Sequence, residues 1–236
     1  MATVIIGAMR VKNEKRIEEA VASLLPLCSR VLVLDDHSDD DTPDRADIKP
    51  GTVTVIRSTL PPTLDEARDK NFLLDRIHEL DPDWVIWIDG DEVLCDHEQL
   101  VLAMTASRTR HAQSFSLKIC YLWDNAEHMR IDGIYGRFHR GSVFRVRGCS
   151  RAKFSSTGNG GNFHCGNVPK VRLSSAIKLS VRVKHYGYME PAERQRKFEW
   201  YNKIDPNNHH EDGYKHIIGR PSRHAPGPVR LVPWIE

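Results

Sequence analysis

Residues 84–94 read Trp-Val-Ile-Trp-Ile-Asp-Gly-Asp-Glu-Val-Leu, an apolar run that ends in an acidic tip. The short run at 84–88 is typical of a strand buried on both faces of a parallel sheet. In such sheets ligands bind outside the carboxyl ends of the strands, which is where Asp89 and Asp91 would stand. This stretch therefore predicts an α/β fold and also the edge of the sheet that carries the site.

The chain in front of this stretch alternates the patterns of strands and helices. Three more apolar segments predict strands, at residues 3–9, 30–34 and 53–56. Three helices are predicted: one after the cap Asn13 with an apolar face from Ile17 to Leu25, one from the capping box Thr63-x-x-Glu66 to about Leu80, and one from the cap Asp96 to about Met104. Repeats of strand and helix imply a right-handed, mostly parallel sheet with helices on both faces.

From Ser114 onward the pattern changes. Strands are predicted at 115–123, 142–147 and 177–183, a loop rich in Ser, Gly and Asn at 155–162, and a helix at 190–204 that starts with Pro191. No repeat or linker divides the chain, so we predict a single domain over 1–204. The tail at 205–236 has weak periodicity, and we expect it to form an extension or a lid.

Charge and composition exclude several classes of protein. The 236 residues hold 34 Lys and Arg against 32 Asp and Glu, and the net charge of +2 is too small for a strong binder of nucleic acid. The apolar runs fall short of a membrane span, and the N-terminus lacks the basic start of a signal peptide. The cysteines form no Cys-x-x-Cys pair, so we expect reduced thiols in a cytoplasmic protein, at Cys28, Cys95, Cys120, Cys149 and Cys165.

Two acidic clusters follow predicted strands: Asp35 and Asp36 after the second, and Asp89 and Asp91 after the fourth. Carboxylates gathered at one edge need counter-charge, and a bound divalent cation is a ready source of it. In an extended Asp89-Gly90-Asp91 segment the two carboxylates point the same way, and Gly90 lets a ligand approach the backbone. Their hard oxygens suit Mg²⁺ or Mn²⁺. The alternative is a solvated Asp–Gly turn.

Several motifs in order carry a resemblance to a known family. The segments Arg10-Val11-Lys12-Asn13-Glu14, 31–42, 67–71 and 84–94 resemble the family 2 glycosyltransferases of GT-A fold, and above all the branch with an Asp-x-Asp-Glu motif that includes lipopolysaccharide-core sugar transferases. A weaker continuation runs from His185-Tyr186-Gly187-Tyr188 to Arg196, Lys197 and Tyr201. The resemblance implies a Rossmann-like GT-A sheet with a smaller acceptor-side region, in which 1–110 bind the nucleotide sugar and 111–204 the acceptor.

The resemblance also implies the reaction and its ligands. A nucleoside-diphosphate sugar, with UDP as the expected nucleotide, would transfer its sugar to an acceptor hydroxyl with inversion. The acceptor would be a sugar, a glycan or a lipid-linked molecule. Mn²⁺ or Mg²⁺ would be held by Asp89, Asp91 and His185. The donor would be bound by Arg10, Asn13, Asp35, Asp36, Arg68, Asn71, Asp89 and Gly90. The alternatives are a helix cap for the Asp35–Asp36 pair, a surface ion pair for Arg68 and a packing role for His185.

The general base is the least defined part of this interpretation. An inverting transferase needs a carboxylate or a histidine to deprotonate the acceptor hydroxyl. The resembling branch commonly has His-Glu before the last strand, whereas this chain has His164 followed by Cys165. His164 and Asp132 are therefore the candidate catalytic residues. Glu92 would orient a ligand or the acceptor.

Aromatic residues after the acidic tip have two possible roles. Tyr121, Trp123 and Tyr135 would either stack on sugar rings or belong to the core.

Two alternative functions are weighed against the transferase. An apolar strand followed by Asp89-x-Asp91 also fits a haloacid-dehalogenase-like phosphatase with Asp89 as nucleophile, although that motif normally lies on the first strand of its domain. A nucleotide-sugar or carbohydrate-binding module without turnover is the second alternative, since the Glu after His164 is missing.

Overall fold

The computed structural model describes residues 3–146, 152–156, 165–173, 176–207 and 213–235. Its first half alternates strands and helices, as the sequence predicts. The elements are β1 (Ile5–Val11), α1 (Ile17–Leu24), β2 (Arg30–Asp35), α2 (Thr42–Ala46), β3 (Val53–Arg57), α3 (Glu66–His78) and β4 (Trp84–Trp87). The four strands pair in parallel in the order β3-β2-β1-β4, so their carboxyl ends meet at one edge.

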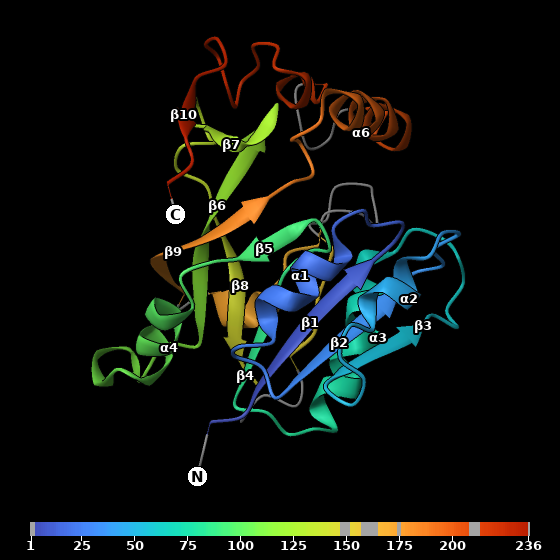
Figure 1. Cartoon of the computed structure of the whole chain (residues 1–236), viewed down its shortest axis with the longest axis vertical. Coiled ribbons are helices and arrows are strands. Elements are labelled where there is room, and N and C mark those ends of the chain that lie inside the picture. The colour runs from blue at the N-terminus through green and yellow to red at the C-terminus, as the bar shows by residue number, and fades with distance from the viewer. Residues whose placement is uncertain (1–2, 147–151, 157–164, 174–175, 208–212, 236) are drawn as a thin grey trace.

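Alternate residues of these strands face two different layers. On one face Met9 and Val11 pack with Ile17 and Leu24 of α1, and on the other Ile6 and Ala8 pack with Leu73, Leu74 and Ile77 of α3. Figure 1 shows α1 in front of the sheet and α3 behind it. The prediction of a parallel sheet with helices on both faces is therefore confirmed for this half.

The second half adds a mixed set of strands. Its elements are β5 (Glu92–Leu94), α4 (His97–Thr105), the 3-10 turn η1 (Ser107–Thr109), β6 (Ser114–Trp123), β7 (Asn125–Arg130), β8 (His139–Arg145), α5 (Lys170–Leu173), β9 (Ala176–His185), α6 (Pro191–Ile204), the 3-10 turn η2 (Lys215–Ile218) and β10 (Leu231–Pro233). The main strand order is β10-β7-β6-β8-β4-β1-β2-β3. Antiparallel β8 joins the two halves by pairing with both β4 and β6.

Strand β9 returns the chain to the acidic tip. It runs parallel to β6 along most of its length and pairs antiparallel with the short β5, where Glu92 lies opposite His185. Helix α6 then leads away above the carboxyl ends of the parallel strands (Figure 1). This path brings the residues of two distant segments, 89–92 and 185–197, to one place.

Three predicted caps and one predicted connection differ from the structure. Asp96 precedes α4 but makes no side-chain cap hydrogen bond, because its carboxylate accepts from Arg182. Asn13 does not cap α1: it has φ 53°, and its amide donates to Asp39 at 2.6 Å, so the helix begins only at Ile17. Helix α3 is capped by Asp65, which accepts from the amide N–H of Arg68 at 3.0 Å, rather than by a box starting at Thr63. The polar connection expected after Trp123 forms β7, which pairs with both β6 and β10.

The carboxyl-terminal segment packs along this second half. Strand β10 pairs with β7, and the backbone N–H of Ile134 donates to the carbonyl of His224 at 2.9 Å. Of the loop predicted at 155–162, residues 157–162 lie outside the described residues, as do His164 and Cys149. The four described cysteines are free thiols. No helix in the described ranges combines the length and apolarity that a membrane crossing requires.

Candidate active site

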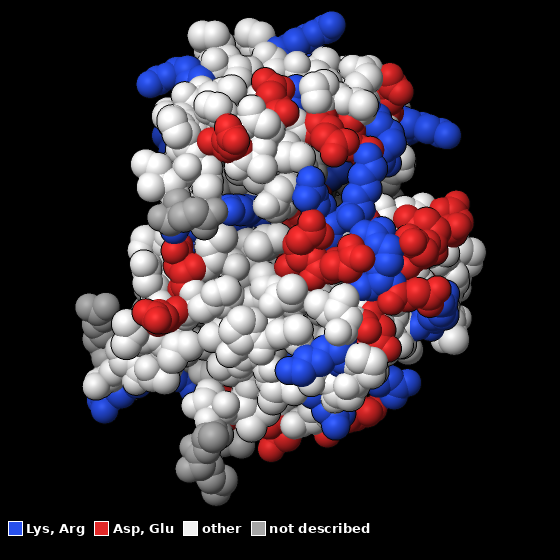
Figure 2. All heavy atoms as spheres, viewed as in Figure 1, with Lys and Arg blue, Asp and Glu red and all other residues white. Residues whose placement is uncertain are grey.

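Two cavities lie at the carboxyl ends of the parallel strands. The larger, of about 740 Å³, extends past β1 and β2 toward Pro62 and Leu64, and we call it the β2-side cavity. The smaller, of about 470 Å³, extends toward Tyr121 and Tyr135, and we call it the β6-side cavity. Both are lined by a shared set of residues, namely Arg10, Glu14, Glu66, Asp91, Lys197 and Tyr201. Figure 2 shows acidic and basic side chains gathered in a mixed band across this level of the molecule.

Asp89 is held by two side chains from other elements. Its Oδ2 accepts from Arg140 Nη1 at 2.8 Å, and its Oδ1 accepts from Asn167 Nδ2 at 3.0 Å. Burial alone would raise the pKa of Asp89, but the Arg140 guanidinium and the Lys70 ammonium hold it below its usual value. The carboxylate is therefore charged and already satisfied on both oxygens.

Glu92 lies beneath Asp89 and is fully buried. Its Oε2 accepts from the backbone N–H of Asp89 at 3.0 Å and pairs with Arg140, while its Oε1 has no hydrogen-bond partner among the described residues. Burial, together with the negative charges of Asp89 and Asp91, raises the pKa of Glu92 to about 7, although the Arg140 guanidinium acts in the other direction. Glu92 thus positions the acidic tip from below and lines neither cavity.

Asp91 belongs to the wall that the two cavities share. Its Oδ2 lies 2.9 Å from Lys197 Nζ and 3.8 Å from His185 Nε2. Burial would raise the pKa of Asp91, but Lys197 and His185 together lower it below its usual value. Burial lowers the pKa of His185 to about 4, so its imidazole is neutral near pH 7. The structure therefore places a carboxylate, an ammonium and a neutral imidazole around one point.

Two glycines allow this packing. A Cβ at Gly187 would stand 2.1 Å from Asp91 Oδ2 and 2.3 Å from Lys197 Nζ, so a larger residue would displace both side chains. A Cβ at Gly90 would stand 2.7 Å from Glu14 Cγ and 2.8 Å from a methyl of Val11. The close approach predicted at Gly90 is thus made by the protein's own side chains, since Gly90 lines neither cavity.

The β2-side cavity contains the first acidic cluster in part. Arg10 donates from Nε to the fully buried Asp69 at 2.9 Å and pairs through Nη2 with Asp36 Oδ2. The other oxygen of Asp36, Oδ1, is buried and has no hydrogen-bond partner within the described part of the chain. Asp35 is buried beside it, accepts from the backbone N–H of Ser38 at 3.3 Å, and lines neither cavity. Asp36 therefore offers an oriented acceptor to a ligand.

Two predicted donor-binding residues are engaged elsewhere. Arg68 donates from Nε to Asp69 at 2.8 Å, from Nη1 to the Thr63 hydroxyl at 3.0 Å, and from Nη2 to the carbonyls of Pro61 and Thr63 at 2.9 Å. Asn71 exchanges both amide atoms with the backbone of Phe154, at 2.8 and 3.0 Å. Neither residue lines a cavity, so the structure gives them the role of fixing the loops behind the site.

Asp132 and Trp123 also lie away from the cavities. Asp132 is 6 % exposed and accepts from the buried Arg130 at 2.8 and 2.7 Å and from the backbone N–H of Arg230 at 3.0 Å. Trp123 is sandwiched between Arg130 and Arg194, whose guanidinium carbons lie 4.4 and 4.1 Å from its ring centre. Asp132 thus forms a buried ion pair away from both cavities, and its role as the base stays a prediction.

Aromatic rings form one wall of the β6-side cavity. Tyr121 stacks on Tyr188 at 5.6 Å and meets Tyr135 edge-on at 4.8 Å, and His185 lies 4.7 Å from Tyr121. Two of these three tyrosines were expected from the sequence. The carboxyl-terminal segment also contributes His216 and His224 to the lining, and the His216 ring lies 6.0 Å from that of Tyr135. The tail is therefore part of the cavity wall.

Sequence reasoning missed a buried network behind Asp89. Lys70 is 4 % exposed and donates to Asn167 Oδ1 at 2.8 Å and to the carbonyl of Cys165 at 2.7 Å. Asn167 in turn donates to Asp89, so the chain Lys70–Asn167–Asp89 links α3 to the acidic tip. A lysine on the inward face of an amphipathic helix was the available signal, because such a residue needs a buried partner.

Asp91 and His185 are the side chains at this point that could ligate a divalent cation. No group of three or more His, Cys, Asp and Glu side chains converges within the described residues. Asp91 and His185 nevertheless offer one carboxylate and one neutral imidazole that face each other, and His185 Nδ1 is a buried atom with no partner among those residues. Such a pair fits Mn²⁺ or Mg²⁺ if the remaining ligands are phosphate oxygens and water. Asp89, whose oxygens each accept one hydrogen bond, from Arg140 and from Asn167, stays a predicted third ligand.

Comparisons with known proteins bear on the fold. No family model and no curated protein sequence matches the chain. Among solved structures, glucosyl-3-phosphoglycerate synthase from Mycobacterium tuberculosis, in complex with Mn²⁺, UDP and glucosyl-3-phosphoglycerate, matches with a TM-score of 0.50 and 17% identity over 86% of this chain and 80% of that chain. A mannosyltransferase from Pyrobaculum calidifontis, in complex with GDP-Man and Mn²⁺, matches with a TM-score of 0.53 and 15% identity over 91% of this chain and 67% of that one.

The chain has the GT-A fold. The likeness extends over most of the chain, and it confirms the predicted α/β architecture with a smaller second region. At such low identity the likeness concerns the fold alone, so function has to be argued from the site.

Proposed function

We propose that this protein is a metal-dependent glycosyltransferase that moves a sugar from a nucleoside-diphosphate donor to a hydroxyl acceptor. The observation that carries the proposal is the place of Asp91, in the wall shared by two cavities. A nucleotide sugar has its diphosphate between the nucleoside and the sugar, so a site for it needs a charged junction between two compartments. Asp91, His185 and Lys197 form such a junction.

The β2-side cavity suits the nucleoside. The buried Oδ1 of Asp36 would accept a hydrogen bond from the base or the ribose, because a buried carboxylate oxygen without a donor is costly. Arg10 fixes the orientation of this carboxylate by holding its other oxygen and Asp69. Asn13 also lines this cavity, whereas Asp35, Arg68, Asn71 and Gly90 would act only through their neighbours.

Asp91 and His185 would hold the divalent cation. When bound, the cation would stabilise the negative charge that develops on the diphosphate as the sugar leaves. The likeness in fold to glycosyltransferases solved with Mn²⁺ and a UDP or GDP ligand supports this proposal. Asp89 also fixes Arg140 and Asn167 around the junction.

The β6-side cavity suits the sugar and its acceptor. Tyr121 and Tyr135 are among its lining residues and are aromatic side chains of the kind that pack against sugar rings, although Tyr135 is only 3% exposed, while His216 and His224 add polar groups to the lining. An inverting reaction needs a base near the acceptor hydroxyl, and with Asp132 elsewhere His164 remains the proposed base. Cys165, the next residue in the chain, lines this cavity, which supports that choice.

The finer features of the proposal follow the resemblance. They are membership of glycosyltransferase family 2, inversion, UDP as the nucleotide, a sugar, glycan or lipid-linked acceptor, and a cytoplasmic location. A role in polysaccharide synthesis would be in keeping with such an acceptor.

A phosphatase is less well supported. Asp89 follows the fourth strand of the chain, whereas the nucleophile of that motif normally follows the first, and both of its oxygens already accept hydrogen bonds from Asn167 and Arg140.

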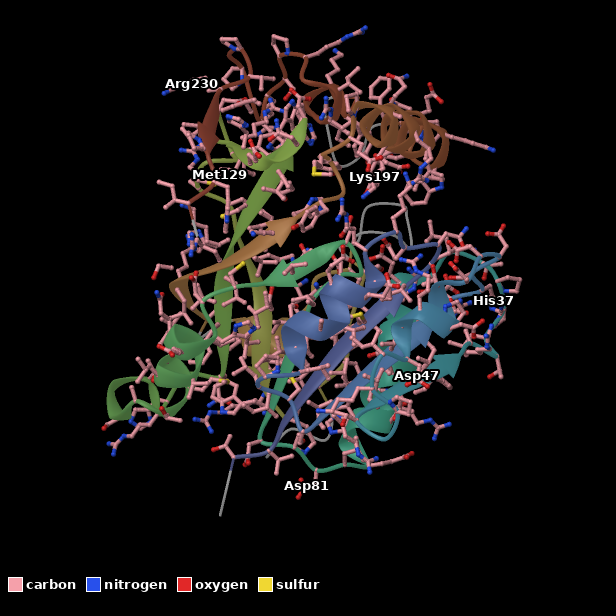
Figure 3. All side chains as sticks on the ribbon, viewed as in Figure 1. His37, Asp47, Asp81, Met129, Lys197 and Arg230 are labelled. Atoms are coloured by element: carbon pink, nitrogen blue, oxygen red, sulfur yellow. The ribbon has the colours of Figure 1, made fainter. Side chains whose placement is uncertain are left out.

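Donor binding by Asp91→Asn tests the proposal. Wild-type protein is titrated calorimetrically with UDP-, GDP-, dTDP- and CMP-sugars, with Mn²⁺ or with EDTA, and transfer is followed by nucleotide release. We expect Mn²⁺-dependent binding of one donor in the wild type and its loss in Asp91→Asn. Asp47→Asn, an exposed carboxylate at the end of α2 far from Lys197 in Figure 3, is the matched control and should bind as the wild type does. Equal donor affinity in Asp91→Asn would refute the site. Binding without any turnover would favour the non-catalytic module.

A further inference from the structure

Lys197 reaches the junction from α6, a helix of the second half of the chain. Its Nζ lies 2.9 Å from Asp91 Oδ2, and its side chain is 23% exposed. Figure 3 places it between α6 and the ends of the parallel strands. Four cationic residues belong to α6, namely Arg194, Arg196, Lys197 and Lys203, and among them Lys197 alone lines both cavities.

Two of the other α6 cations have carboxylate partners, and the third is exposed. Arg194 pairs with Asp124 at 2.7 Å, Arg196 pairs with Glu193 at 2.9 Å, and Lys203 is exposed in the last turn. Lys197 by contrast has Asp91 as its one hydrogen-bond partner among the described residues. An ammonium has three N–H donors, so two remain available on the side of the cavities.

The fold makes room for this ion pair. The absence of a side chain at Gly187 is what lets Lys197 and Asp91 meet, since a Cβ would stand within 2.3 Å of both charged atoms. The backbone N–H of Tyr186 donates to the carbonyl of Asp91 at 2.9 Å and fixes the turn beside it. The pair is therefore a built feature of the junction and not a chance surface contact.

The ammonium of Lys197 and a bound metal ion would compete for the same oxygen of Asp91. Oδ2 contacts Lys197 and also lies nearest to His185, so a metal held by Asp91 and His185 would have to share this oxygen with the ammonium or displace it. A diphosphate at the junction offers several anionic oxygens to an ammonium in exchange for one carboxylate. The ammonium can therefore pass directly from the carboxylate of Asp91 to the phosphate oxygens.

We propose that Lys197 is a ligand of the donor's diphosphate and the resident counter-ion of Asp91. In the ligand-free protein its ammonium neutralises Asp91. When the donor binds, the ammonium turns to the phosphate oxygens and frees Asp91 Oδ2 for the divalent cation. This inference deepens the proposed function, on which it rests, by giving the chain its own cation in the diphosphate site.

Two binding measurements on Lys197→Met test the inference. The first titrates the protein with inorganic pyrophosphate and with the nucleoside diphosphate of the wild-type donor, in EDTA. Because a charge-assisted contact is lost, the affinities for pyrophosphate and for the nucleoside diphosphate should each fall by about ten- to a hundredfold. The second titrates Mn²⁺ alone and follows it by electron paramagnetic resonance. Mn²⁺ should bind Lys197→Met about tenfold more tightly than the wild type, because no ammonium competes for Asp91.

The controls separate this role from a structural one. Lys203→Met removes the same charge from an exposed position of the same helix and should leave both affinities unchanged. Lys197→Arg should keep pyrophosphate binding within a few-fold, since it restores the cation. If Lys197→Met does not fold, Lys197→Gln carries the same two readouts.

The outcomes distinguish this inference from the proposed function. Unchanged pyrophosphate affinity in Lys197→Met, or Mn²⁺ binding that does not strengthen, overturns the inference even if the wild type transfers sugar. Wild-type protein that binds pyrophosphate through Lys197 but binds no nucleotide sugar removes the proposed function and, with it, the assignment of the bound anion as the diphosphate of a donor.

Discussion

His185 Nε2 lies 3.8 Å from Asp91 Oδ2 because β5 and β9 pair with Glu92 opposite His185. One ladder thus joins the acidic tip of the parallel half to a strand from the second half. Burial among Tyr121 and Tyr188 keeps the imidazole neutral. The proposed metal site consequently exists only when both halves are packed together.

The titration of His185 should appear in the pH dependence of stability. Its pKa of about 4 in the folded protein is below the ordinary 6.5. The unfolded chain therefore binds more protons between these values, and stability is lost as pH falls from 6.5 toward 4. His185→Gln removes this contribution, so the difference in unfolding free energy between the two proteins should change by up to about 1.4 kcal/mol per pH unit.

Urea unfolding at pH 7, 6 and 5 measures that difference. His216, whose pKa burial also lowers to about 4, is present in both proteins and cancels. Parallel stability curves for wild type and His185→Gln would show that the imidazole is not held neutral.

A methyl group at position 187 should disable the junction. In Gly187→Ala the new Cβ would overlap Asp91 and Lys197, and we expect loss of donor binding by at least about tenfold with the protein still folded. Gly227→Ala is the control, because a Cβ there meets nothing within 4 Å. Calorimetry with the donor and a thermal melt give the two readouts. Equal binding by both variants would mean that the Asp91–Lys197 geometry does not matter for the ligand.

The role of Asp36 can be separated from that of the diphosphate site. Asp36→Asn should lower the affinity for the nucleoside diphosphate by about tenfold, because a charged hydrogen-bond acceptor is lost. It should leave the affinity for pyrophosphate unchanged. Asp44→Asn, an exposed carboxylate on α2 paired with Arg57, should alter neither. Were pyrophosphate affinity to fall as much as nucleotide affinity, Asp36 would be acting on the phosphates or on the fold.

Asp132→Asn distinguishes an ion pair from a base. Because Arg130 is fully buried, removing the charge of its partner should cost about 3 kcal/mol of unfolding free energy, with turnover of the folded enzyme unchanged. A general base would behave in the opposite way, with kcat falling by about 10²- to 10⁴-fold at nearly constant stability. Denaturation and steady-state turnover on the same preparation decide between the two.

The parts of the fold that could be predicted are those set by local pattern. β1, β2, β3 and β4 are short apolar runs between amphipathic helices, and their carboxyl ends carry the acidic residues as expected. Strand β7, in contrast, is the polar segment Asn125–Arg130, whose strand state comes from pairing with β6 and β10. No local propensity signals such a strand.

The sequence motifs point to the acidic residues at the ends of the strands. They do not point to the basic residues that pair with them. Asp91 and His185 lie together at the ends of the strands, as the motifs indicate, while Asp36 lines only the β2-side cavity and their roles toward a ligand stay predictions. Arg140 and Lys197, which determine the charge balance, lie far along the chain from Asp89 and Asp91, and single side chains on β8 and α6 carry no pattern that names them. Arg68 and Asn71 look the same in sequence whether they face a ligand or a loop.

The last strand of the sheet has a consequence for handling the protein. β10 covers β7, and its Pro233, opposite His128, lacks the N–H that an incoming strand would need. Trimming the chain before Leu231 would leave the backbone of β7 open as an unprotected edge, a template for self-association. Shortened versions should therefore precipitate more readily on concentration than the intact chain, even where their cavities are unaltered.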